Sequence, residues 1–158
     1  MKFHTVTLTD PMVITTNYWN FRNHSIPMKK KIIQTKEAPA PIGPYNQAVI
    51  CNGLLFMSGQ IAIDPNTGEL VLDTVIDETT LVMNNIKAIL ATAGCGFDDV
   101  IKCSIFLSDM NNFNAVNEVY GSYFTSNFPA RECVEVSVLP KNVNVEISVI
   151  AALPEHNQ

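Results

Sequence analysis

Residues 143–151 alternate between two kinds of side chain, and this pattern constrains the fold more than any other stretch of the sequence. Five apolar residues recur at every second position: Val143, Val145, Ile147, Val149 and Ala151. Successive side chains of a strand point to opposite faces of a sheet, so the segment predicts a strand with one fully apolar face. We expect helices to pack on that face.

Two helices are predicted from the spacing of apolar residues. In the segment 77–93, Val82, Ile86 and Leu90 fall on one face, and Gly94 is suited to end the helix. A second helix is predicted over 112–125, because Pro129 prevents it from extending further.

Turn residues divide the rest of the chain into strands. Asn52-Gly53 lies between two apolar runs and predicts a tight hairpin. The run 38–44 contains three prolines and a glycine, which predicts a loop. The predicted strands are 31–35, 47–51, 54–58, 100–107, 132–138 and 143–151.

Composition excludes several classes of protein. The formal charge of -5 and the absence of a basic cluster beyond residues 29–31 argue against nucleic acid as a ligand. No apolar run is long enough to cross a bilayer, so no membrane partner is expected. The four cysteines show no paired spacing, which favours reduced thiols in a cytoplasmic protein over disulfides or a metal site.

The length of 158 residues fits one main domain with two terminal segments. Residues 1–28 differ in composition from the rest and are interpreted as an N-terminal extension of unknown role. Residues 29–154 form the predicted domain, and residues 155–158 a C-terminal tail. All three histidines lie outside this domain, so histidine-based nucleophilic chemistry is not expected within it.

Arg131 is the only arginine after Arg22 and lies where a proline-led loop becomes a strand. Arginine is well suited to bind a carboxylate through two parallel hydrogen bonds, so Arg131 is a candidate anchor for an acidic ligand. The alternative is a surface ion pair with Glu132 or Glu135.

Glu146 lies on the polar side of the last predicted strand. A carboxylate at the centre of a strand is costly unless it is paired or exposed. It therefore lies either on an exposed face, in an ion pair between subunits, or in a partly dry pocket as an acid or base with a raised pKa.

Three groups of motifs, taken together, resemble those of the RidA family, also called the YjgF/YER057c/UK114 family of reactive intermediate deaminases. They are IGPYNQA at 42–48, FMSGQI at 56–61, and PAR at 129–131 followed by LPK at 139–141 and VEI at 145–147. The resemblance covers about residues 29–154, and the order and spacing of the motifs make it specific.

The resemblance implies a chorismate-mutase-like α+β fold, with a mixed sheet and two helices packed on one face. It also implies a homotrimer with active sites between subunits. The implied activity is the hydrolysis of 2-imino acids and their enamine tautomers, such as 2-iminobutanoate and 2-iminopropanoate, to 2-keto acids and ammonia, without a cofactor.

In this interpretation Arg131 binds the substrate carboxylate, and Glu146 orients the attacking water or relays its proton. The expected substrate-binding residues, besides Arg131, are Tyr45, Ser58, Gly59, Asn117 and Cys133. Asn117 could equally be an ordinary residue of a helix surface. For Cys133 a structural role is favoured over a nucleophilic one, since no histidine is available to activate it.

One residue departs from the pattern of the family, whose members usually have a small residue directly after the arginine. Here it is Glu132. Strand alternation points Glu132 away from Arg131, so the carboxylate grip should survive.

Two other functions compete with the deaminase. The first is a module that binds 2-keto or amino acids in the same pocket without turnover. The second is an RNA-directed or protein-holding role, for which the acidic charge makes RNA cleavage unfavourable.

Overall fold

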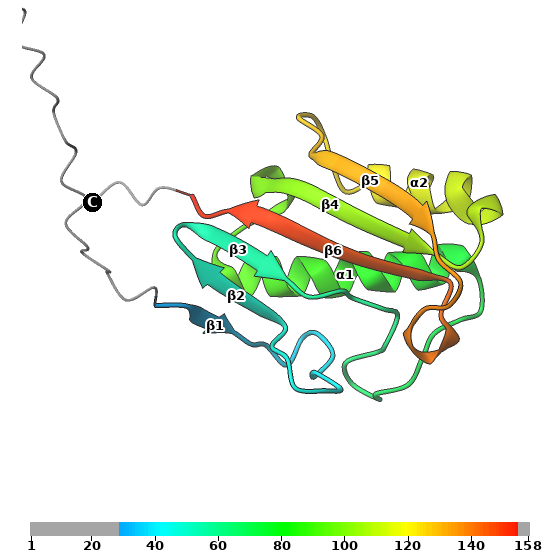
Figure 1. Ribbon diagram of the computed structural model, residues 1–158, viewed down its shortest axis with the longest axis horizontal. Helices are drawn as coiled ribbons and strands as arrows, with labels where there is room; N and C mark the ends of the chain where they lie inside the picture. Colours follow the sequence, from blue (N-terminus) through cyan, green and yellow to red (C-terminus); the bar gives the residue numbers. More distant parts are fainter. Residues whose placement is uncertain (1–28, 155–158) are drawn as a thin grey trace, which may run out of the picture.

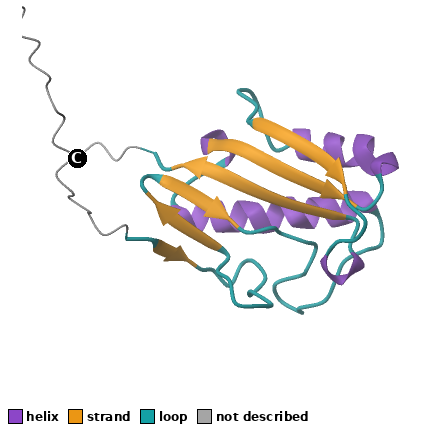
Figure 2. Ribbon diagram, viewed as in Figure 1, coloured by secondary structure: helices purple, strands orange, loops and turns teal. Residues whose placement is uncertain are grey.

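The computed structural model describes residues 29–154, in which a mixed six-stranded sheet carries two helices on one face (Figure 1, Figure 2). The strand order across the sheet is β1-β2-β3-β6-β4-β5. Neighbouring strands run antiparallel except β4 and β5, which are parallel. The strands are β1 (Lys31–Ile33), β2 (Ala48–Cys51), β3 (Leu54–Met57), β4 (Val100–Leu107), β5 (Ala130–Glu135) and β6 (Val145–Ala152). The predicted mixed sheet with two helices on one side is confirmed.

Helix α1 (Val75–Ala93) is defined by clear signals at both ends. The Thr74 hydroxyl accepts a hydrogen bond from the backbone N–H of Asp77 at 3.1 Å, which is a typical N-cap. At the other end Gly94 has a φ of 81°, the left-handed conformation that glycine adopts without strain. The predicted helix 77–93 is confirmed, with a start two residues earlier.

Helix α2 (Phe113–Gly121) is shorter than predicted. The chain leaves the helix after Gly121 through tight turns, in which the N–H groups of Tyr123 and Phe124 bond to carbonyls three residues earlier. These turns bring Phe124 into the core against Phe97, with ring centroids 5.3 Å apart. Burial of this ring explains why the helical periodicity extended past the true end of the helix. Short 3-10 helices at Phe97–Asp99, Met110–Asn112 and Pro140–Asn142 complete the described part of the chain.

The core lies between α1 and the apolar face of the sheet. The alternating residues of the last strand are all buried, and Val145, Ile147 and Ala151 are 0% exposed. The four that lie in β6, from Val145 to Ala151, pack with the apolar side of α1, which includes Val82 and Ile86. Val143 precedes β6, which begins two residues later than the predicted strand, and packs in a smaller cluster with Ile61 and Leu139. The alternation in the sequence thus correctly predicted which face of β6 the helices cover.

The hairpin is confirmed, whereas the bounds of the fifth strand are wrong. Asn52 and Gly53 both have positive φ, 51° and 75°, as a two-residue hairpin turn of the favoured type requires. Strand β5 begins and ends earlier than the predicted 132–138. It is an edge strand whose only partner among the described strands is β4, and the pairing runs from Lys102 opposite Ala130 to Leu107 opposite Glu135.

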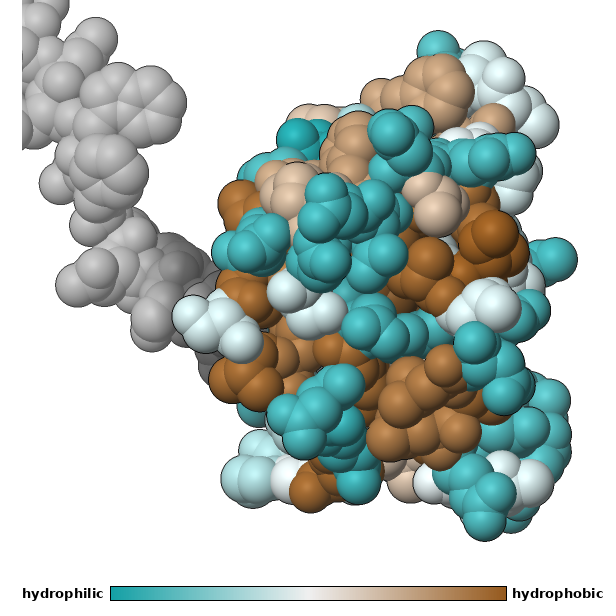
Figure 3. All heavy atoms as spheres, turned by 90° about the vertical axis from the view of Figure 1, so that its right-hand side faces the viewer, coloured by the Kyte–Doolittle hydropathy of each residue, from teal (hydrophilic) through white to brown (hydrophobic). Residues whose placement is uncertain are grey.

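Within residues 29–154 the other face of the sheet carries no helix, and it mixes polar with apolar side chains. From β4 and β6 it presents Lys102, Ser104 and Ser148, which lie beside the apolar Phe56 and Ile150. Figure 3 shows apolar patches between polar side chains over the end of the molecule where β4 and β5 end.

Among residues 29–154, no helix is both long enough and apolar enough to cross a membrane. The interpretation of residues 1–28 as an extension and of 155–158 as a tail concerns segments outside the described residues.

Candidate active site

A cavity of about 290 Å³ opens beside the start of β6 and contains four of the predicted site residues. Its walls come from three separate segments: the loop before β2, the segment that follows β3, and the start of β6 with the turn before it. The predicted residues in it are Tyr45, Ser58, Gly59 and Glu146. Apolar side chains supply much of the remaining wall, among them Pro39, Ile42, Ile61, Ile63 and Pro140.

Among residues 29–154, Glu146 is the only carboxylate that lines this cavity. It lies on β6 opposite Phe106, half-buried, on the face of the sheet away from the helices. Burial raises the pKa of its carboxyl above the ordinary value. Within the described part of the chain Glu146 forms no ion pair, so a partly dry pocket fits it better than an exposed face does.

Gly59 makes room for the Glu146 carboxylate in its present position. A Cβ atom built on Gly59 would overlap one carboxylate oxygen of Glu146 and lie 2.6 Å from the carboxyl carbon. Only glycine therefore leaves room for the carboxylate beside the backbone of this segment.

Ser58 and Tyr45 have their polar groups fixed by local hydrogen bonds. The Ser58 hydroxyl donates to the carbonyl of Asn46 at 2.7 Å, which leaves its oxygen available only as an acceptor. The Tyr45 hydroxyl accepts from the N–H of Ile42 at 3.2 Å, and this side chain is 44% exposed at the mouth of the cavity. Both residues can contact a ligand without serving as a strong base.

Arg131 and Asn117 line a second cavity, of about 430 Å³, next to α2. The guanidinium donates to the Asn117 side-chain oxygen at 2.7 Å. It also lies over two rings, 5.0 Å from the centroid of Tyr120 and 5.7 Å from that of Phe113. These contacts hold the planar group in place while leaving it exposed toward the cavity.

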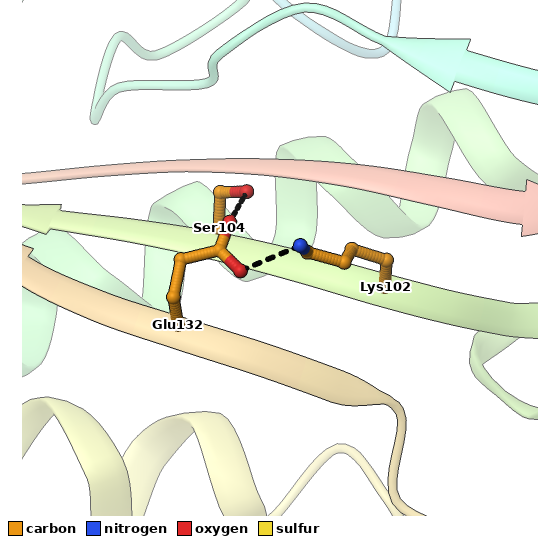
Figure 4. A network of polar contacts seen from close by, with 3 residues as sticks. All are labelled: Lys102, Ser104 and Glu132. Carbon is orange, nitrogen blue, oxygen red and sulfur yellow. Dashed lines mark hydrogen bonds and ion pairs between the residues drawn. The ribbon is translucent and has the colours of Figure 1, made fainter.

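The surface ion pairs considered for Arg131 do not form among the described residues. Glu132 pairs with Lys102 at 2.7 Å and accepts a hydrogen bond from Ser104 on the opposite face of the sheet (Figure 4). Glu135 accepts from the backbone N–H of Met110 at 2.7 Å. Arg131 is therefore free of a carboxylate partner within residues 29–154, and Glu132 points away from it as alternation predicted.

Cys133 shares a strand face with Arg131 but lines neither of these two cavities. Burial raises the pKa of its thiol, and the nearby Arg131 only partly opposes this effect. A thiol with a raised pKa is a weak nucleophile, which agrees with a structural role.

Within one chain the predicted site residues other than Cys133 therefore fall into two groups. Tyr45, Ser58, Gly59 and Glu146 lie together, and Arg131 and Asn117 lie together, but no residue lines both cavities. Sequence reasoning did not single out Gln47 and Gln60, which line the first cavity and are 2% and 6% exposed. Both lie inside the motifs 42–48 and 56–61, and a polar side chain within a motif that already contains predicted site residues is the signal that could have found them.

The sequence model of one protein family, described as Endoribonuclease L-PSP, matches residues 35–153. The chain belongs to this family, the RidA/YjgF family. A RutC family protein of Synechocystis is 52% identical over 129 residues, which cover 80% of this chain and 99% of the relative. The human protein named 2-iminobutanoate/2-iminopropanoate deaminase is 45% identical over 122 residues, 77% of this chain and 89% of the relative.

Solved structures of RidA/YjgF relatives have the same fold. The structure of E. coli TdcF with bound serine superposes with a TM-score of 0.74 at 45% identity and covers 77% of this chain and 98% of that chain. A putative endoribonuclease from Thermotoga maritima superposes with a TM-score of 0.78 at 47% identity, over 81% of this chain and all of that chain.

Proposed function

We propose that this RidA/YjgF protein hydrolyses 2-imino acids, such as 2-iminobutanoate and 2-iminopropanoate, to 2-keto acids and ammonia. The observation that carries the proposal is the Glu146 carboxylate, which is half-buried in a largely apolar cavity and has a raised pKa. Mammalian relatives named for this activity are 44–48% identical and support it.

The reaction needs a positioned water and a group that moves a proton. With the imine nitrogen protonated, Glu146 accepts a proton as water adds to the C=N carbon, and returns it to the amino nitrogen of the resulting carbinolamine. The C–N bond then breaks as the C=O bond forms, and the hydroxyl proton leaves with ammonia as ammonium. A base whose pKa is raised toward neutrality is better matched to this exchange than an ordinary glutamate. Imines already hydrolyse in water, so positioning and proton transfer can supply enough acceleration without a covalent nucleophile.

Arg131 is proposed to bind the substrate carboxylate through its planar guanidinium. A charge-assisted contact of this kind contributes about 1.5–3 kcal/mol. Asn117 orients the guanidinium through the 2.7 Å hydrogen bond, and Tyr45 and Ser58 contact the substrate at the mouth and wall of the other cavity. Cys133 contributes to the strand that carries Arg131, not to bond making.

Arg131 and Glu146 line different cavities of one chain, and we propose that a homotrimer unites them. In a closed ring, the face of one copy that carries Arg131 meets the face of the next that carries Glu146. The helix-free face of the sheet supplies the side of this contact that carries Glu146, and the β5 edge beside α2 supplies the side that carries Arg131, in a chorismate-mutase-like arrangement. Three sites per trimer follow from the symmetry.

Turnover is tested by generating imino acids in place with an amino-acid oxidase and timing their disappearance with and without this protein. Acceleration over buffer is expected for the native chain, with a large loss in Glu146→Gln and none in Glu69→Gln, which removes an exposed carboxylate from a turn. Decay at the rate of buffer with every imino acid tried would refute the enzyme.

The competing function is a module that binds amino or keto acids without turnover. The bound serine in the TdcF structure favours it, because that ligand has a carboxylate and no imine. Ligand binding that persists while imine decay is unchanged would support this module. Salt-sensitive binding or cleavage of RNA would instead support the activity that the description Endoribonuclease L-PSP names.

A further inference from the structure

The wall of the cavity that carries Glu146 is fastened to helix α1 by two buried polar side chains outside the cavity. These are Glu78 and Asn85, which are 0% and 1% exposed. They are seven residues apart, two turns of one helix, and so lie on the same face of α1. Polar side chains are rare at such positions unless their hydrogen bonds are satisfied, and both bond to backbone near the cavity.

Glu78 holds the residues directly before Glu146. One of its carboxylate oxygens accepts from the backbone N–H groups of Asn144 and Val145, at 2.7 and 3.2 Å. Its other oxygen accepts from the side-chain amide of Asn144 at 2.9 Å. A carboxylate can only accept hydrogen bonds, and here three N–H donors meet it, so the start of β6 has one favoured position on α1.

Asn85 holds the segment on the other side of Glu146. Its amide nitrogen donates to the carbonyl oxygens of Ile61 and Ile63, at 3.3 and 3.0 Å. The same segment pairs with β6 one residue after Glu146, where Gln60 and Ile147 exchange backbone hydrogen bonds of 2.8 and 3.1 Å. The backbone on both sides of Glu146 is thus attached to α1. The residues before Glu146 bond directly to Glu78, and the residue after it pairs with the 60–63 segment, which Asn85 holds.

We infer that Glu78 and Asn85 are positioning residues, which fix Glu146 and the facing Gly59 segment at the separation that the reaction needs. The clearance is small, since the Glu146 carboxylate would overlap a single added carbon on Gly59. A shift of this wall by less than the width of one carbon atom therefore changes the direction in which the carboxylate points into the cavity. The inference rests on the proposed function only for its catalytic readout.

The test compares three variants of the full chain with the native protein. Asn85→Ala removes both bonds to the 61–63 segment without changing any charge, and Glu78→Gln replaces an acceptor oxygen by an amide that faces N–H donors. For both we expect kcat to fall roughly ten- to hundred-fold. KM is expected to stay within about twofold, because neither residue touches the substrate, and the acid midpoint of the pH–rate profile is expected to move.

Leu90→Ala is the matched control. Leu90 lies on the same helix, is 1% exposed and packs in the main core, but has no side-chain hydrogen bond to the cavity wall. It should lower the melting temperature while leaving kcat and the acid midpoint unchanged at a temperature where the protein stays folded. Wild-type kcat and midpoint in Asn85→Ala, or the same shift in Leu90→Ala, would overturn the inference.

A second measurement separates this inference from the proposed function. The pKa of Glu146, followed by NMR of its carboxyl carbon, should fall toward its ordinary value in Asn85→Ala as the side chain is released, and should not change in Leu90→Ala. This readout needs no turnover, so it decides the positioning role even if no imine is hydrolysed. Asn144→Ala removes the 2.9 Å side-chain contact of Glu78, and with it a 3.2 Å hydrogen bond from the Ser108 hydroxyl, but keeps both backbone contacts of Glu78. It provides the test if the stronger variants do not fold.

Discussion

Replacement of Gly59 by alanine is a single-atom test of how Glu146 is held. The added Cβ would overlap the Glu146 carboxylate oxygen and lie 2.6 Å from the carboxyl carbon and 3.0 Å from Cγ. Nothing else lies so near, and the backbone of Gly59 is not in the left-handed region, so alanine can adopt its conformation. The Glu146 side chain therefore has to leave its position in the cavity, while the fold remains.

The expected effect on activity is large and that on stability is small. Loss of a general base typically costs 10²–10⁴ in rate, and we expect the lower end, about a hundredfold or 2.7 kcal/mol, because imines hydrolyse readily in water. Strain from overpacking costs about 1–3 kcal/mol, less the ~0.4–1 kcal/mol that Gly→Ala gains from a less flexible unfolded chain. The free energy of unfolding should thus fall by between about 0 and 2.6 kcal/mol.

A double-mutant cycle gives the assay. Imine hydrolysis is measured for Gly59→Ala, Glu146→Ala and the double variant. If Gly59 acts only by making room for Glu146, the double variant should be no slower than Glu146→Ala alone. Gly96→Ala is the matched control. Gly96, like Gly59, lies outside the left-handed region, and its added Cβ would meet only an Asp99 oxygen at 4.0 Å. Wild-type turnover in Gly59→Ala would refute this reasoning.

Three further predictions follow from the same geometry. Arg131→Lys should lower kcat/KM about ten- to hundred-fold, because a lysine cannot reproduce a bidentate contact with the substrate carboxylate that contributes about 1.5–3 kcal/mol. Native-like values in steady-state kinetics would contradict the role of Arg131 in binding this carboxylate. Glu132→Ala should keep wild-type kcat/KM, because Glu132 pairs with Lys102 on the other face of the sheet; a loss comparable to that of Arg131→Lys would show that the two residues are coupled. The raised pKa of Glu146 predicts two effects of pH. Activity should fall as the pH drops through this pKa, because the carboxylate becomes protonated and can no longer act as a base. The protonated carboxyl stabilises the fold at low pH, and this contribution should be lost as the pH rises through the same pKa. Glu146→Gln should abolish the second effect in denaturant titrations across pH, and an unchanged dependence would assign it to another group.

The sequence predicted those elements whose signals are local. The alternation of 143–151 identified the buried face of β6, the Asn52-Gly53 pair identified the hairpin, and Gly94 identified the end of α1. Each of these depends on neighbouring residues and on backbone conformations that few residue types adopt. The limits of β5 depend instead on the length of β4, and the end of α2 depends on where Phe124 finds space in the core, so neither could be read from its own segment.

The candidate site was predictable in its parts more than in its arrangement. Glu146 and Gly59 lie in separate motifs, and only the fold shows that the carboxylate packs against that glycine. The sequence also does not show that Glu146 and Arg131 line two different cavities of one chain. Glu78 was not recognised because a glutamate in the first turn of a helix is ordinary, and its burial is a property of the tertiary structure.

The most direct test of the central claim is a crystal structure of this protein with 2-oxobutanoate, the keto acid that the proposed reaction would produce. We predict that its carboxylate binds the Arg131 guanidinium of one copy, and that its keto carbon lies within one water of Glu146 in the neighbouring copy. A ligand held without Arg131, or an assembly in which the cavities of Arg131 and Glu146 remain apart, would contradict the account.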